Sequence, residues 1–190
     1  MKFFSLHKTA LYSIIFVFFL SSCSKEYETE TFENSSLISV KLQGTQSVLS
    51  RANITILDVQ FQILEDENNP NAWLSLNTIN TGNHDLVNIT GNDVVTLVDF
   101  EEIPTGFIYS IKLVLGDENS IVKNGVEYTL DMAQDCDYQS TNIVAKQLET
   151  NKLYDFLIEF DIDGSVEFLS QGTVLLDPKM NTLLRRFELF

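Results

Sequence analysis

The chain has 190 residues, a formal net charge of −15 and 44% hydrophobic residues, which suits one ordinary domain with a short processed segment and excludes a wholly disordered chain. The acidic excess repels phosphate backbones and argues against nucleic-acid binding. Two cysteines exclude a disulfide-rich scaffold and a four-thiolate zinc site.

The N-terminus has the pattern of an export signal. Lys2 and Lys8 are basic, and residues 10–20 form an uncharged, apolar run. A helix of that length rises only about 16 Å, short of the roughly 30 Å hydrocarbon layer of a bilayer. The run therefore predicts a secretory signal over residues 1–22 rather than a membrane span.

The residues that end this run, Leu20-Ser21-Ser22-Cys23, resemble the lipobox of bacterial lipoproteins. The resemblance implies cleavage before Cys23 and acyl chains on its sulfur and new amino terminus. Such chains, each worth about 0.8 kcal/mol per buried CH₂, would hold the protein at a bilayer. The prediction is a lipid-anchored outer-membrane protein that faces either the periplasm or the cell exterior. The alternative is an ordinary signal peptide followed by a chance cysteine.

An acidic stretch at residues 24–33 follows this cysteine. It predicts a solvated tether within residues 23–35 that keeps the following domain off the bilayer. It also resembles the surface-export signals of Bacteroidota lipoproteins, in which Lys and acidic residues follow the lipidated cysteine. Both interpretations remain open at this point.

Residues 36–190 predict one all-β domain. At 54–63 the apolar positions change parity, which predicts a β-bulge near Leu57-Asp58. Asn124-Gly125 between two apolar pairs predicts a tight hairpin. Alternating or short apolar runs predict further strands at 37–42, 73–76, 85–90, 94–100, 109–115, 154–162, 174–176 and 183–190. The runs at 85–90 and 94–100 are either two short strands or one strand with a turn at Gly91-Asn92.

These patterns together predict about eight strands arranged as a two-sheet antiparallel sandwich. No helix of ten or more residues is expected in the mature chain. Residues 131–147 are compatible with a loop, an edge strand or a helical turn.

Three patches carry a family resemblance: residues 103–116 (IPTGFIYSIKLVLG), 124–130 (NGVEYTL), and 148–154 (LETNKLY) with 157–161 (LIEFD) and 165–166 (SV). A final run at 176–178 (LDP) adds to it. These patches are similar to a Bacteroidota lipoprotein family known as domain of unknown function 4382, and Asn119 stands near the Asn that follows the first run there. The resemblance covers about residues 36–190 and implies a transthyretin-like or immunoglobulin-like sandwich. It implies no catalytic residues. Residues 44–51 lack the acids and proline that the family carries after its first strand.

Candidate residues for chemistry are few. Asp161 and Asp163 would project to one face if their strand continues, and an oxygen-rich loop of this kind can hold Ca²⁺ or be a plain solvated turn. Trp73 offers an aromatic face for a carbohydrate, or else packs in the core. His84 is the single histidine after the signal, so a hydrolytic triad or a multi-histidine zinc site is not expected.

These observations favour a non-enzymatic lipoprotein module without a cofactor, anchored to the bilayer through Cys23, that binds or displays a protein, peptide or glycan. The alternative is a carboxylate-dependent enzyme or enzyme accessory that acts on extracellular glycan or peptide through Asp161 and Asp163. A third interpretation is a subunit of a surface polymer that exchanges strands.

Overall fold

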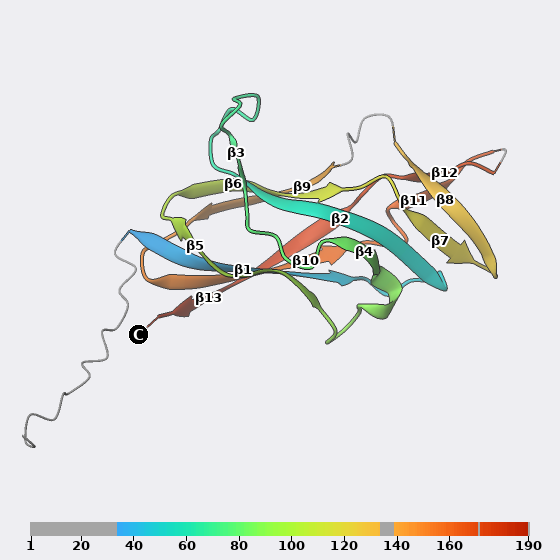
Figure 1. The fold of residues 1–190 in the computed structure, drawn as a ribbon, viewed down its shortest axis with the longest axis horizontal. Helices are drawn as coiled ribbons and strands as arrows, with labels where there is room; N and C mark the ends of the chain where they lie inside the picture. The colour runs from blue at the N-terminus through green and yellow to red at the C-terminus, as the bar shows by residue number, and fades with distance from the viewer. Residues whose placement is uncertain (1–33, 134–138, 171, 190) are drawn as a thin grey trace, which may run out of the picture. The chain divides into compact units, whose positions relative to one another are not determined.

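Thirteen β-strands and one short 3₁₀ helix form the regular structure of residues 34–133, 139–170 and 172–189, the part of the chain that the computed structural model describes (Figure 1). These residues belong to one unit, Thr31–Phe190. The elements are β1 (Ser35–Gly44), β2 (Arg51–Gln62), β3 (Trp73–Ser75), β4 (Gly82–Asp85), η1 (Leu86–Asn88), β5 (Val95–Pro104), β6 (Phe107–Leu115), β7 (Ser120–Lys123), β8 (Val126–Met132), β9 (Gln139–Gln147), β10 (Lys152–Phe160), β11 (Val166–Phe168), β12 (Val174–Leu176) and β13 (Met180–Glu188).

The strands form two sheets, which confirms the predicted all-β sandwich. One sheet has four strands in the order β13-β10-β1-β5. The other has nine, in the order β11-β12-β8-β7-β2-β6-β9, with β3 and β4 also paired to β2. The predicted number of about eight is too low, because strands of three or four residues such as β4 and β11 are too short to show a period of two.

Two strand pairs are parallel, which corrects the expectation of a purely antiparallel sandwich. β1 runs parallel to β10, and β8 runs parallel to β12. Alternation of apolar residues assigns the two faces of a strand but not its direction in the sheet. Between β1 and β10 the chain crosses to the other sheet and back twice, through β2–β4 and through β6–β9, so these parallel strands are joined by long connections and not by a hairpin.

The core lies between the two sheets and is lined by alternate residues of their central strands. The rings of Phe61 in β2 and Phe156 in β10 meet across it, with centroids 5.2 Å apart. Both side chains are fully buried. Other fully buried contributors from the long strands are Ile38, Val40, Leu42, Ile54, Ile56, Ile111, Leu113, Tyr154 and Ile158.

The bulge predicted in β2 is confirmed. The register between β2 and β6 shifts between Ile56 and Asp58. Asp58 holds this irregularity, since its carboxylate accepts hydrogen bonds from the Val59 N–H and the Thr78 hydroxyl, each at 2.8 Å. Both halves of β2 therefore keep their apolar side chains directed into the core.

The predicted hairpin at Asn124-Gly125 is confirmed as well. Both residues have positive φ, 53° and 78°, as a two-residue type I′ turn requires. The turn joins β7 to β8, with Lys123 paired to Val126.

One expectation for local structure is wrong in part, and one set of alternatives is decided. Of residues 85–90, only Asp85 lies in a strand, as the last residue of β4, because its side chain accepts a hydrogen bond from Val87 N and caps η1, so that the chain turns there. Of the open alternatives for residues 131–147, the edge strand is confirmed for β9, which pairs only with β6 among the described strands. Residues 134–138 lie outside the described part.

Candidate functional site

A cavity of about 220 Å³ lies on the outer face of the four-stranded sheet. Residues of β10 such as Phe156 point into the core, so their neighbours Asp155 and Leu157 lie on the outer face. The strand register brings the outer residues of β1, β10 and β13 side by side. The cavity is lined from these strands by Lys41, Gln43, Asp155, Leu157, Leu183 and Arg185, and from the segment before β5 by Gly91, Asn92 and Val94.

Charges in this cavity are partly paired. Lys41 Nζ lies 3.0 Å from a carboxylate oxygen of Asp155. Arg185 lies opposite Asp155 in the strand register but forms no ion pair with any residue in the described ranges. Because Lys41 and Asp155 neutralise each other, the lining carries one net positive charge in a chain whose net charge is −15.

One buried oxygen in this lining has no hydrogen-bond donor. Gln43 Oε1 lacks a partner among the described residues, and the amide nitrogen of the same side chain donates to Glu159 at 2.7 Å. Asp155 is engaged through both carboxylate oxygens, since Lys41 Nζ lies 3.0 Å from each of them. Since folded proteins satisfy most buried acceptors, Gln43 Oε1 marks a place where a ligand donor would be stabilising.

Asp161 and Asp163 serve their own chain instead of sharing a site. β10 ends at Phe160, so the two acids do not project from one strand face. Asp161 Oδ1 accepts from the Gly164 N–H at 3.0 Å, and Asp163 accepts from the Ser47 hydroxyl and, at 3.3 Å, from the Val48 N–H. Within the described ranges, no three His, Cys, Asp or Glu side chains group as metal ligands. A Ca²⁺ role for these acids stays a sequence prediction.

Trp73 lies on the other sheet, so the structure does not bring it together with Asp161 and Asp163. It pairs with Gln62 on the outer face of β2 and is half-buried rather than part of the core. The Lys112 ammonium lies 3.4 Å from the centroid of its ring. This cation covers one face of the indole, so that face is not free to stack on a sugar. Ligand contact through the rest of the ring stays a prediction.

Lys112 is more buried than its place on the outer face of β6 predicts. Outer-face polar residues of β6 are expected to be solvated, yet Lys112 is only 9% exposed. Burial lowers the pKa of Lys112 from 10.5, and the carboxylate of Glu67 partly opposes this effect. The segment around Trp73 therefore encloses the cation and holds it against the ring.

Replacing Lys112 by methionine is expected to change how stability depends on alkaline pH. The pKa of Lys112 is lower in the folded state, so as pH rises through that pKa towards 10.5 the unfolded chain binds more protons. The wild type should therefore gain stability relative to Lys112→Met over this window. Urea unfolding of both proteins from pH 8 to 10.5 measures the gain, and a constant difference between them would contradict it.

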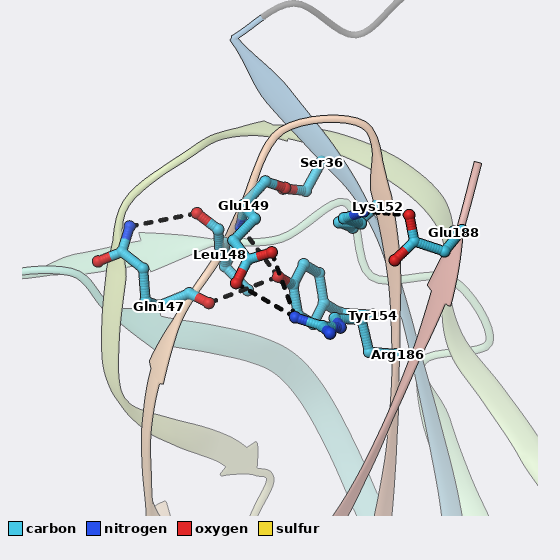
Figure 2. Close-up of polar contacts among 8 residues, drawn as sticks. All are labelled: Ser36, Gln147, Leu148, Glu149, Lys152, Tyr154, Arg186 and Glu188. Carbon is cyan, nitrogen blue, oxygen red and sulfur yellow. Dashed lines mark hydrogen bonds and ion pairs between the residues drawn. The ribbon is translucent and has the colours of Figure 1, made fainter. Parts of the chain in front are cut away.

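Tyr154 ties the turn between β9 and β10 to the core (Figure 2). Its buried hydroxyl accepts a hydrogen bond from the Glu149 N–H at 2.9 Å and donates to the Gln147 carbonyl at 3.5 Å. The Ser36 hydroxyl donates to the Glu149 carbonyl at 2.7 Å. These bonds fix the start of β1 against the turn, and since they go to backbone groups, we assign the cluster a structural role.

Two exposed ion pairs flank this turn (Figure 2). Arg186 Nη1 lies 3.2 Å from both carboxylate oxygens of Glu149. Lys152 donates to Glu188, and this hydrogen bond, with the charge of Lys152, lowers the pKa of Glu188. Because both pairs are solvent-accessible, they add little stability.

Cys23 and residues 1–22 lie outside the described part of the chain, so lipid attachment stays a prediction. In the described ranges, no helix is long and apolar enough to cross a bilayer.

Sequence reasoning missed the residues that form the cavity. Lys41 and Arg185 are 144 positions apart, and each is one polar residue in an alternating strand. The sequence pattern that bears on them is this alternation, which predicts that their side chains point outward but not which strands lie next to each other in the sheet.

A model of the family described as domain of unknown function (DUF4382) matches residues 35–178. No curated protein and no solved structure matches the chain. The match begins at the first residue of β1 and ends between β12 and β13, so Leu183 and Arg185 of the cavity lie beyond it. It spans well over half of the chain, which therefore belongs to the DUF4382 family.

Proposed function

We propose that this protein is a lipid-anchored outer-membrane lipoprotein of the Bacteroidota type whose sandwich is a non-enzymatic binding module. The observation that carries the binding role is the cavity on the four-stranded sheet, whose lining contains a buried oxygen without a donor, Gln43 Oε1. The proposed anchor is Cys23, which follows an apolar run and two small residues.

The position of the cavity along β1, relative to the proposed anchor, is compatible with a protein that is both lipid-anchored and able to bind a ligand. Ser35 is twelve positions after Cys23, so the tether spans at most about 43 Å when extended. Gln43 lies eight residues along β1 from Ser35, or about 26 Å at the rise of a strand. The cavity therefore lies towards the end of β1 opposite to the tether, where a ligand in the periplasm or outside the cell reaches it.

The anchor is tested by mass spectrometry of the mature protein from its own envelope. We expect the full chain to begin at Cys23 and to carry the mass of attached acyl chains. Cys23→Ala should lose that mass, whereas Ser24→Ala, a neighbouring change that keeps the thiol, should retain it. An intact leader or an unmodified Cys23 in the wild type would overturn the anchor.

Binding is tested by blocking the cavity. Leu183 lines it and is 44% exposed, so Leu183→Trp fills the space without burying a new side chain in the core. Ile143→Trp adds the same bulk to an exposed strand residue of the other sheet. On arrays of glycans and peptides, a ligand of the wild type should be lost from Leu183→Trp and kept by Ile143→Trp. Equal binding by all three proteins would exclude the cavity as the binding site.

No observation specifically favours the enzyme alternative. The carboxylates of Asp161 and Asp163 are taken up by backbone N–H groups and a serine hydroxyl, and they face different segments. The proposal is therefore limited to binding.

A further inference from the structure

We propose that the cavity on the four-stranded sheet binds a sugar residue that carries a carboxylate, such as a hexuronic acid within a polysaccharide. This inference rests on the proposed function and names the ligand class for the same site. It follows from three properties of the lining: one unpaired acceptor, several apolar side chains and one unpaired cation.

The unpaired acceptor favours a ligand that has hydrogen-bond donors. Gln43 Oε1 lacks a donor, although it is shielded from solvent. Sugar hydroxyls donate readily and can reach this oxygen from the cavity once the end of the Gln43 side chain rotates. A simple inorganic anion would satisfy the cation of the site but is a poor source of donors for this oxygen.

The apolar part of the lining suits the C–H face of a sugar ring. Leu157 and Leu183 pair directly across β10 and β13, and Val94, which precedes β5, also lines the cavity. The cavity measures about 220 Å³. This is smaller than the roughly 300–1,000 Å³ of drug-sized pockets, so one ring fits and the rest of a chain would lie outside.

The unpaired cation in the lining is the reason for proposing a carboxylate on the sugar. Lys41 is already paired with Asp155, whereas Arg185 has no ion-pair partner in the described ranges. A guanidinium binds a planar carboxylate through two parallel hydrogen bonds. The acidic character of the whole chain makes this positively charged lining a distinctive feature of its surface.

The test compares methyl glucuronide with methyl glucoside, titrated into the full chain in detergent and followed by NMR. The glucuronide should bind at least about ten-fold more tightly, as a charge-assisted hydrogen-bond pair predicts. Arg185→Gln should abolish this preference. Arg186→Gln removes the same charge at the next position, where the side chain pairs with Glu149, and should keep the preference.

The outcomes separate this inference from the proposed function. Equal affinity for the two sugars, lost in Leu183→Trp, would overturn the carboxylate inference and leave the binding role intact. The same would follow if an acidic peptide bound in the cavity in place of either sugar. If neither sugar bound and no array ligand depended on Leu183, both proposals would fail.

Discussion

Replacing Phe156 by alanine is expected to lower the free energy of unfolding by about 3–5 kcal/mol. Phe156 is fully buried on β10, and its ring centroid lies 5.2 Å from that of Phe61 on the opposite sheet. The substitution removes the apolar area of the ring and leaves a cavity between two sheets whose hydrogen-bonded strands cannot close around it. The aromatic contact across the core is lost as well.

Urea unfolding of the wild type and Phe156→Ala measures this effect. By thermal unfolding, the loss corresponds to a lower Tm by roughly 2–4 °C for each kcal/mol in a domain of this size. Phe187→Ala is the matched control, because Phe187 is 48% exposed on β13 and its removal should cost little. Comparable losses in the two variants would show that the core is not formed as described.

Asn119→Ala is expected to cost about 2–4 kcal/mol, since it leaves two backbone groups without partners. Asn119 is 2% exposed. Its Oδ1 accepts from the Thr55 N–H at 2.9 Å, and its Nδ2 donates to the Gly116 carbonyl at 2.7 Å. These bonds join β2 to the connection between β6 and β7, where the ladder of β2 passes from one strand to the other.

Two further variants test whether the loss of these hydrogen bonds causes the destabilisation. Asn119→Asp keeps the acceptor for Thr55 but cannot donate to Gly116, so it should also destabilise. Asn71→Ala, at an exposed loop position, should leave unfolding nearly unchanged. Chemical denaturation measures all three. A loss below about 0.5 kcal/mol for Asn119→Ala, the usual range for surface positions, would exclude the bridging role.

Local features of the fold were predictable because each depends on neighbouring residues. The parity change in β2 predicts the bulge at Asp58, and Asn124-Gly125 predicts a turn with positive φ at both positions. Residues 85–90 show the limit of this reasoning. Their apolar residues are compatible with a strand, but a side-chain cap from Asp85 stabilises a turn instead.

The arrangement of strands was not predictable in the same way. Parallel pairing of β1 with β10 depends on which strands meet after long excursions of the chain, and a period of two carries no information on direction. The burial of Lys112 also depends on a distant segment, since the residue that lies over it is Trp73. The alternation of residues within one strand cannot reveal that a side chain from another segment lies over Lys112.

The order of residues alone determined the class of fold, the bulge, the hairpin and the inward or outward direction of most strand side chains, because steric preferences act over a few neighbouring positions. Tertiary structure alone decided the cavity. It placed Lys41, Asp155 and Arg185 on adjacent strands, left Gln43 Oε1 in the lining without a donor, and directed Asp161 and Asp163 to separate backbone partners. Contacts between residues more than a hundred positions apart depend on the packing of the whole chain, which no local pattern records.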